Sequence, residues 1–527
     1  MPRVLDLRHV KSLAVRDLIE LANLGDFDRV NEQVRQVAGC TRPVNLVGQT
    51  TTLDATTRNV LRSYSTANEP TGRLLTTCGN RRASRCPACS RVYAADTYHL
   101  IKAGLSGGKT VPEAVRTHPR VFATLTAPSF GPVHNRPTDK PRCACGAQHA
   151  ENAAELGTPL RSSTYDYTGA VLWNAHAGAL WARTTTYIRR ALAAHLGMTQ
   201  KALNAALRIS FAKVAEYQKR GLVHFHAVIR LDGPKGSNQP PPPWATVDVL
   251  KTAIESATIK NAAESRGRDT RARLTVTSAH TGDREIRWGD RLDVREITAL
   301  GDGELTDKAV AGYVAKYATK SAEDSGTVDR SLICAPCGGR GYQTAPDGYH
   351  RKRLWKRADA PRNPDGSRPR LDIPPGRFRD LCPHCEGTGQ TEPIENLPVQ
   401  DHVRRMISTA WELGQFPEFA DLKLSKWAHM LGFRGHFSTK SRRYSTTLGA
   451  LRDVRRAWRV EQARARAGLH APDESSTLVT ESSWAYLASG YRPGEELLAA
   501  QVRYEIKQEL RFRQEEGDLG AECAADR

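Results

Sequence analysis

The chain has 527 residues, 39% of them hydrophobic, and carries 77 Lys and Arg against 57 Asp and Glu, a formal net charge of +20. This composition excludes a disordered chain and predicts a globular protein of about two to four domains. The positive charge is spread along the chain and favours a polyanionic partner such as nucleic acid, although it can also serve solubility alone. Because the sequence shows neither a membrane span nor the apolar core of a signal peptide, we expect a cytoplasmic protein with reduced cysteines.

Periodicity and breaker residues predict the main elements in chain order. Helices are expected at residues 10–24, 90–104, 166–197, 246–262 and 306–323. Strands are expected at residues 120–128 and 291–300, with a two-stranded hairpin at 207–231. The residues that follow 395 are expected to be mostly helical and basic.

The expected hairpin carries two histidines in an otherwise apolar strand, within QKRGLVHFHAVIRL at 218–231. Residues i and i+2 of a strand point to the same side, so His224 and His226 share one face. If Gly221 ends a three-residue turn in the left-handed conformation, Glu216 lies opposite His224. Two imidazoles and a carboxylate suit Mg²⁺ or Mn²⁺ that polarises a phosphodiester, whereas two hydrogen-bonded core histidines are the simpler alternative.

The expected helix at 306–323 contains two tyrosines four residues apart, in AVAGYVAKYATK. This spacing puts Tyr313 and Tyr317 on one helical face. A tyrosine hydroxyl can attack phosphorus when a cation stabilises the charge that develops on the phosphoryl oxygens. Lys316 and Lys320 can bind DNA phosphates or the leaving oxygen. A tyrosine pair at this spacing is also common as a packing stripe in a core.

Together these segments resemble the motifs of the HUH endonucleases, and most closely the rolling-circle replication initiators of actinobacterial plasmids and integrative elements. FATLTAP at 122–128 resembles their first motif, HFHAV at 224–228 the histidine motif, and YVAKY at 313–317 the tyrosine motif. The three occur in the family's order. LGFRGHFSTKSRRYSTTLGALR at 431–452 also resembles the C-terminal part of these initiators.

The resemblance implies a mechanism and a fold. A tyrosine nicks one strand at the double-strand origin, stays joined to the 5′ phosphate, and leaves a 3′ hydroxyl for a polymerase. It also implies that His224 and His226 are metal ligands. The expected hairpin register makes Glu216 the third ligand, and His134 after the first motif is a less favoured substitute. We therefore expect an α+β protein with an HUH-type antiparallel sheet flanked by helices, and a host helicase as a partner. Which of Tyr313 and Tyr317 nicks first is open.

Two other readings of the same motifs remain. One is a relaxase or transposase of the same chemistry, although many relaxases place the tyrosine near the N-terminus. The other is a zinc-containing DNA-binding regulator, in which the histidine and tyrosine motifs are core.

Two CxxC pairs, in CAPCGGRGY and CPHCEGTGQ, predict a structural zinc site of four thiolates. Its ligands are Cys334, Cys337, Cys382 and Cys385. The spacing of the earlier cysteines is less regular, and the simplest second site combines Cys86, Cys89, Cys143 and Cys145. Cys78 or His149 can replace one of those four, and Cys40 and Cys523 are unassigned. The Arg-rich flanks CGNRRASRC and HRKRLWKR are candidate phosphate contacts.

LSKWAHMLGFRGHFSTKSRRYS interleaves cations with aromatic residues, a pattern typical of nucleic-acid surfaces. The predicted contacts with DNA are Lys320, Arg434, Lys440, Arg442 and Arg443. A solvated basic face is the alternative. LSKWAHMLG is a candidate start of a helix-turn-helix.

These predictions give four domains. Residues 1–75 form an N-terminal helical segment, and residues 76–330 form an HUH nuclease core with a Cys-rich zinc-binding insertion (78–149). Residues 331–395 form a zinc-binding CxxC insertion, and residues 396–527 form a helical basic DNA-binding region.

Overall fold

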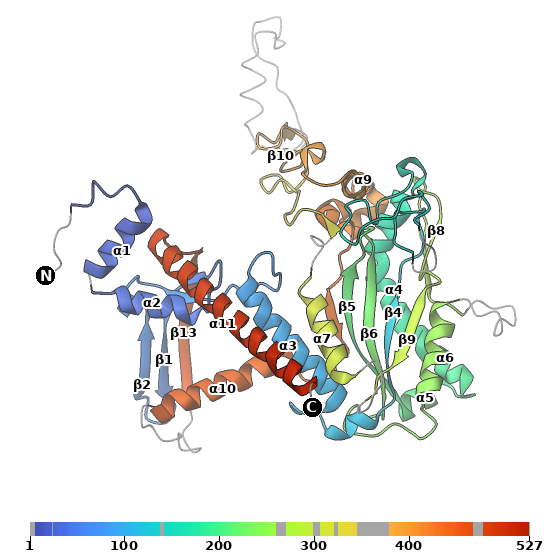
Figure 1. The fold of residues 1–527 in the computed structure, drawn as a ribbon, viewed down its shortest axis with the longest axis horizontal. Coiled ribbons are helices and arrows are strands. Elements are labelled where there is room, and N and C mark those ends of the chain that lie inside the picture. The colour runs from blue at the N-terminus through green and yellow to red at the C-terminus, as the bar shows by residue number, and fades with distance from the viewer. Residues whose placement is uncertain are drawn as a thin grey trace, which may run out of the picture. The chain divides into compact units, whose positions relative to one another are not determined.

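The protein is described from a computed structural model, which covers residues 6–23, 25–137, 142–259, 270–298, 306–320, 325–344, 379–466 and 478–525. The chain divides into two compact units (Figure 1). The first unit consists of residues 1–103, 311–319 and 446–527, and the second of residues 104–310 and 320–445. These boundaries differ from the four predicted domains, because the two ends of the chain fold together. None of the helices in the described ranges is long and apolar enough to cross a membrane.

An antiparallel sheet and several helices build the first unit. The sheet has the order β13-β1-β2, and β3 also pairs with β1. Its strands are β1 (Val44–Asp54), β2 (Val60–Ser65), β3 (Leu74–Thr76) and β13 (Leu478–Ser489). Its helices include α1 (Leu13–Asn23), α2 (Phe27–Gln36), α10 (Leu448–Arg466) and α11 (Pro493–Ala525), while α3 (Pro87–Ser106) begins in this unit.

The first unit corrects the expectation of a helical segment over residues 1–75. Helices end at Gln36, and β1 pairs with β13, so that Val44 lies opposite Ser489. A buried ion pair reinforces this joining of the chain ends, because Arg73 donates to Glu495 and to Asn45. The C-terminal region is likewise only partly helical, since β13 lies between α10 and α11.

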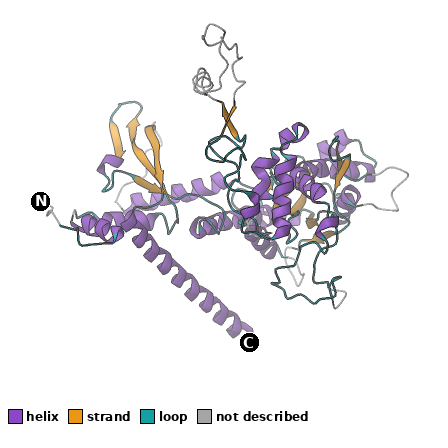
Figure 2. Cartoon of the chain, turned by 90° about the horizontal axis from the view of Figure 1, so that it is seen from above, coloured by secondary structure: helices purple, strands orange, loops and turns teal. Residues whose placement is uncertain are grey.

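The second unit is built on a five-stranded antiparallel sheet in the order β12-β5-β6-β4-β9 (Figure 1). Figure 2 distinguishes the strands from the helices by colour. The strands are β4 (Arg120–Leu125), β5 (Arg208–Tyr217), β6 (Val223–Asp232), β9 (Leu292–Glu296) and β12 (Ser438–Lys440). Helices of this unit are α4 (Tyr167–His195), α5 (Gln200–Ala206), α6 (Val247–Thr258) and α9 (Asp401–Leu413). Two small hairpins complete it, β7 (Arg273–Val276) with β8 (Arg284–Arg287) and β10 (Tyr342–Thr344) with β11 (Arg379–Leu381). Mixed helix and antiparallel sheet confirm the α+β class.

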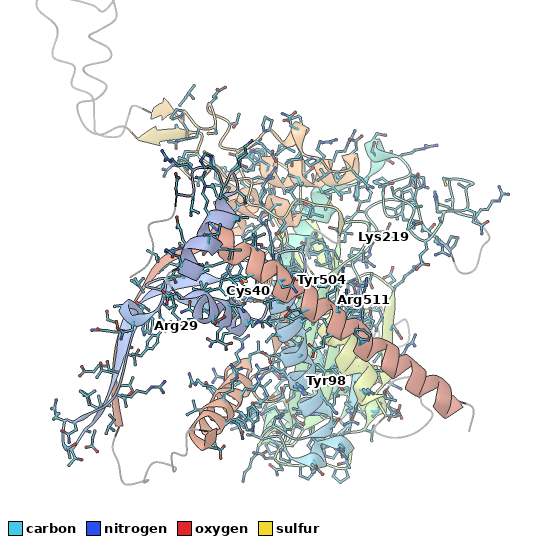
Figure 3. All side chains as sticks on the ribbon, turned by 60° about the vertical axis from the view of Figure 1, so that its left-hand side comes forward. Arg29, Cys40, Tyr98, Lys219, Tyr504 and Arg511 are labelled. Carbon is cyan, nitrogen blue, oxygen red and sulfur yellow. The ribbon has the colours of Figure 1, made fainter. Side chains whose placement is uncertain are left out.

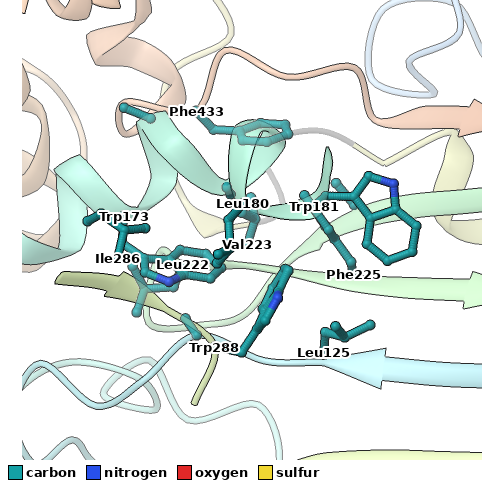
Figure 4. Close-up of a cluster of buried hydrophobic side chains, with 14 of the residues drawn as sticks. Leu125, Trp173, Leu180, Trp181, Leu222, Val223, Phe225, Ile286, Trp288 and Phe433 are labelled. Carbon is teal, nitrogen blue, oxygen red and sulfur yellow. The ribbon is translucent and has the colours of Figure 1, made fainter. Parts of the chain in front are cut away.

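The long helix α4 packs on one face of the five-stranded sheet (Figure 4). Trp181 of α4 contacts Phe225 of β6 edge to face, with ring centroids 6.1 Å apart. Phe225 also contacts Trp288 and Phe433. Because strand side chains alternate between faces, Phe225 fills the core while its neighbours His224 and His226 stand on the opposite face.

The segment expected to open a helix-turn-helix differs from that expectation. Residues Leu424–Met430 form a 3₁₀ helix, η7, which follows the 3₁₀ helix η6 (Pro417–Leu422). Lys423 and Leu431, which flank η7, both adopt left-handed backbone conformations that break a regular helix. Leu424, Ala428 and Leu431 are fully buried, so this segment contributes to the core of the second unit.

Candidate active site and metal centres

The predicted hairpin register is confirmed. β5 and β6 pair antiparallel with Glu216 opposite His224, and Gly221 has a φ of +73°. The N–H of Gln218 donates to the carbonyl of Leu222 at 2.8 Å and closes the turn. Lys219 in the turn (Figure 3) donates to the carbonyl of Glu151 at 2.7 Å. The sequence therefore brings one carboxylate and two imidazoles together through local turn chemistry.

Glu216, His224 and His226 form a compact group, called here the triad. Nε2 of His224 and Nε2 of His226 lie 3.1 and 3.2 Å from Oε2 of Glu216. An octahedral divalent ion with bonds of about 2.1 Å separates neighbouring ligand atoms by ~3.0 Å, which fits these distances. The three ligand atoms could therefore hold a metal ion.

Charges and neighbours favour the metal-binding forms of Glu216 and His226. Burial opposes ionisation of Glu216, but hydrogen bonds from His224, His226 and Lys320 outweigh it and lower its pKa to about 2. Burial lowers the pKa of His226, an effect that its hydrogen bond with Glu216 opposes. A charged carboxylate and neutral imidazoles are the states that bind a cation.

The strand of the predicted first motif supports His226. Thr124 of β4 lies opposite His226, and its Oγ1 is 3.1 Å from Nδ1 of that ring. Phe122 stacks on the same ring, with an interplanar angle of 4° and centroids 5.7 Å apart. A metal-binding histidine usually donates its second ring N–H to such a partner, which fixes the ring orientation.

Lys320, a predicted DNA contact, lies beside the triad. Its Nζ donates to Oε1 of Glu216 at 3.1 Å, so the ammonium binds the free oxygen of the triad carboxylate. Sequence analysis missed this contact because it joins residues 104 positions apart.

The tyrosine motif lies on α7 (Asp307–Ala318), as expected. The rings of Tyr313 and Tyr317 are 4.4 Å apart, and Lys316 lies 5.9 Å from the Tyr317 ring. The buried side of α7 consists of Val310, Ala311, Val314, Ala315 and Ala318. Tyr313 is 37% exposed, so the tyrosine pair is not the core stripe of this helix.

Among the described residues, the cysteines form three groups that could hold metal ions. They are Cys40, Cys78, Cys86 and Cys89; His134, Cys143, Cys145 and His149; and Cys334, Cys337, Cys382 and Cys385. The third group is the predicted four-thiolate set. The structure corrects the predicted second set, because Cys86 and Cys89 gather with Cys40, whereas Cys143 and Cys145 gather with two histidines.

Distances within the groups fit tetrahedral zinc. Bonds of about 2.3 Å between zinc and sulfur place neighbouring sulfurs ~3.8 Å apart. The Sγ pairs Cys86–Cys40 and Cys89–Cys40 are both separated by 3.8 Å, and Cys78–Cys89 by 3.6 Å. In the third group, Cys334–Cys382 and Cys337–Cys385 are separated by 3.8 and 3.7 Å.

The second group combines two cysteines with two histidines. Nδ1 of His134 lies 3.2 Å from Nε2 of His149, which in turn lies 3.3 Å from Sγ of Cys145. His134 therefore does not take part in the triad. Sequence analysis included His149 as an alternative ligand of the second set, but it assigned His134, which precedes the CxC pair, to the triad instead.

The predicted DNA contacts near residue 440 have different surroundings. Lys440 is half-buried, and its Nζ donates to the carbonyl of Ser445 at 3.0 Å, which indicates a structural role in this loop. Arg434 donates to the carbonyl of Asp421. Arg442 and Arg443 are exposed and line a cavity. HRKRLWKR lies outside the described residues.

The family described as the replication initiator protein of pSAM2, RepSA, matches residues 26–504 of the chain. The chain belongs to this family of replication initiator proteins. A replication initiator protein of Streptomyces ambofaciens is 45% identical to this initiator over 490 residues, which cover 92% of each chain. No solved structure shows a significant match to the initiator.

Proposed function

We propose that this initiator starts rolling-circle replication by nicking one strand at a double-strand origin through a phosphotyrosine intermediate, and that it rejoins the strand after replication. The triad carries this proposal, because Glu216, His224 and His226 meet at the distances of a facial metal site. Membership of a replication initiator family supplies the biological context.

The proposed reaction exchanges one phosphodiester for another. The phenol oxygen of Tyr313 or Tyr317 loses its proton and bonds to phosphorus, and the bond from phosphorus to the 3′ oxygen breaks. The departing 3′ oxygen takes up a proton, and the DNA stays joined to tyrosine through its 5′ phosphate. A divalent cation in the triad would stabilise the charge on the phosphoryl oxygens. Return attack by the 3′ oxygen reverses the exchange and reseals a strand.

Contacts of two residues that flank the tyrosines in the chain support this proposal. Asp307 at the first turn pairs with Arg120 at 3.1 Å, and Lys320 just beyond the last turn binds Glu216. Arg120 pairs with Arg230 on β6, at the far end of the strand from His224. Asp307 and Lys320, which flank the tyrosines in the chain, therefore both bind residues of the second unit.

We also propose that three zinc ions stabilise the fold, one in each cysteine group. Each group offers four ligands from more than one chain segment, so the ion would join these segments without leaving a position open to substrate. The ion at the triad is proposed to be Mg²⁺ or Mn²⁺, because its ligands are oxygen and imidazole rather than thiolate.

The test is formation of a denaturation-resistant adduct between protein and single-stranded origin DNA in the presence of Mn²⁺. We expect an adduct from the wild type and none from the double variant Tyr313→Phe, Tyr317→Phe. Tyr187→Phe on α4 is the matched control and should keep full activity. An adduct from the double variant would refute the tyrosine assignment, and no adduct from the wild type would favour a DNA-binding regulator.

A further inference from the structure

A cavity of about 400 Å³ in the second unit is lined by guanidinium groups from separate chain segments. Arg189 comes from α4, Arg208 begins β5, and Arg442 and Arg443 follow β12. Asn204 and Ser441 also line it. No lining residue is acidic. This concave, cationic lining suits a ligand with several negatively charged oxygens.

The described residues do not compensate the charge of these arginines. Among the described residues, no carboxylate forms an ion pair with any of the four, and Asp232, opposite Arg208 on β6, is occupied by Arg230, His118 and Ser210. Burial lowers the pKa of Arg189, and the neighbouring charge of Arg208 adds to that effect. A bound anion would relieve the electrostatic repulsion between these like charges.

Two of the guanidinium groups are already oriented. Arg189 donates to the carbonyl of Thr185 at 3.2 Å, and Arg208 donates to the carbonyl of Pro234 at 3.3 Å. Each has further N–H groups to offer, since a guanidinium carries five donors in a fixed plane. Groups oriented before binding lose less conformational entropy when they take up phosphate oxygens.

We propose that this cavity, called the arginine pocket, binds the phosphate backbone of DNA that flanks the nicked bond. The choice of DNA as the ligand depends on the proposed function, but the pocket itself is separate from the triad. Arg208 and Glu216 lie at opposite ends of β5, roughly 26 Å apart. Duplex DNA carries one phosphate per ~3.4 Å on each strand, so the contact falls about eight base pairs from the nick. The pocket therefore holds the DNA flank while the triad holds the cleaved bond.

The test measures binding of labelled duplex origin DNA by fluorescence anisotropy at several salt concentrations, without added Mg²⁺ or Mn²⁺. The double variant Arg208→Gln, Arg442→Gln removes two phosphate contacts. We expect it to reduce the slope of log affinity against log salt by roughly 2. Arg208→Lys keeps a cation and should restore part of the loss. Because the experiment measures binding and not cleavage, its result can be interpreted even if the proposed nicking chemistry is wrong.

The matched control is Arg161→Gln, Arg183→Gln, which removes two exposed arginines of the same unit from outside the pocket. It should bind like the wild type. Equal loss in both double variants, or no loss in the pocket variant, would overturn the proposal. ATP is the second probe, since a free nucleotide carries the same phosphate chemistry. Binding of ATP that Arg208→Gln abolishes, with DNA affinity unchanged, would also overturn the assignment to DNA.

Discussion

Lys213 carries an ammonium group into the hydrophobic core of the second unit. It is 4% exposed, and its Nζ lies 3.7 Å from the centroid of the Phe225 ring. Burial lowers its pKa to about 7, whereas an unfolded lysine has a pKa of about 10.4. Between these values the unfolded chain binds more protons, so this residue makes folding less favourable as the pH falls from about 10 to about 7.

Replacing Lys213 with methionine removes that proton linkage. We expect Lys213→Met to raise the free energy of unfolding at pH 7 by about 1–4 kcal/mol. The gain should shrink as the pH approaches 10. Urea unfolding of both proteins at several pH values measures it, and a gain that does not vary with pH would contradict the buried charge.

Thr124 tests the support of the triad without replacing one of its ligands. Thr124→Val removes the hydroxyl 3.1 Å from Nδ1 of His226. We expect the affinity of the triad for Mn²⁺ to fall about 10- to 100-fold, the usual cost of losing such a partner. Thr126→Val, two residues along the same segment and also half-buried, is the control. Calorimetric titration with Mn²⁺ distinguishes them, and equal affinities would show that Thr124 does not orient the ring.

At the scale of elements, the ion pair between Asp307 and Arg120 anchors the start of α7. Asp307 is buried, pairs with Arg120 and accepts a hydrogen bond from Ser106 at 3.0 Å. Asp307→Asn removes the charge that compensates Arg120, so we expect the free energy of unfolding to fall by about 1.5–3 kcal/mol. Asp293→Asn removes an exposed partner of Arg295 and should cost less than 1 kcal/mol. Equal effects of the two substitutions in urea unfolding would contradict the anchor.

The elements that sequence analysis predicted well depend on local pattern. The hairpin of β5 and β6 follows from alternation and from Gly221, and α4 follows from a long helical period with Asp166 capping the N–H of Gly169. β1 and β13 were missed because each strand is stabilised by a partner at the other end of the chain. The triad was predictable because a tight turn sets its register. The zinc groups were only partly predictable, because Cys40 and His134 meet their partner ligands only in the folded protein.

At the scale of the whole molecule, Cys40 joins three parts of the first unit. Its Sγ contacts those of Cys86 and Cys89 at the start of α3, and its carbonyl accepts a hydrogen bond from Tyr491, just before α11. Figure 3 labels this residue. A zinc ion in this group would therefore stabilise both ends of the chain together.

We expect the purified protein to contain three zinc ions, and Cys40→Ser to contain about two. Cys523→Ser, at the eleventh cysteine, should keep all three. Elemental analysis gives the stoichiometry, and limited proteolysis should show faster cleavage of the first unit in Cys40→Ser. Unchanged zinc in Cys40→Ser, together with loss of a single shared ion in both Cys86→Ser and Cys143→Ser, would restore the original grouping and contradict the structure.

The central claim is that DNA becomes attached to a tyrosine of α7, and mapping of the linked peptide tests it most directly. Trypsin cleaves after Lys308, Lys316 and Lys320, so it places Tyr313 in AVAGYVAK and Tyr317 in YATK. Mass spectrometry of the digested adduct should find a nucleotide on one of these two peptides. A nucleotide on any other peptide would contradict the account.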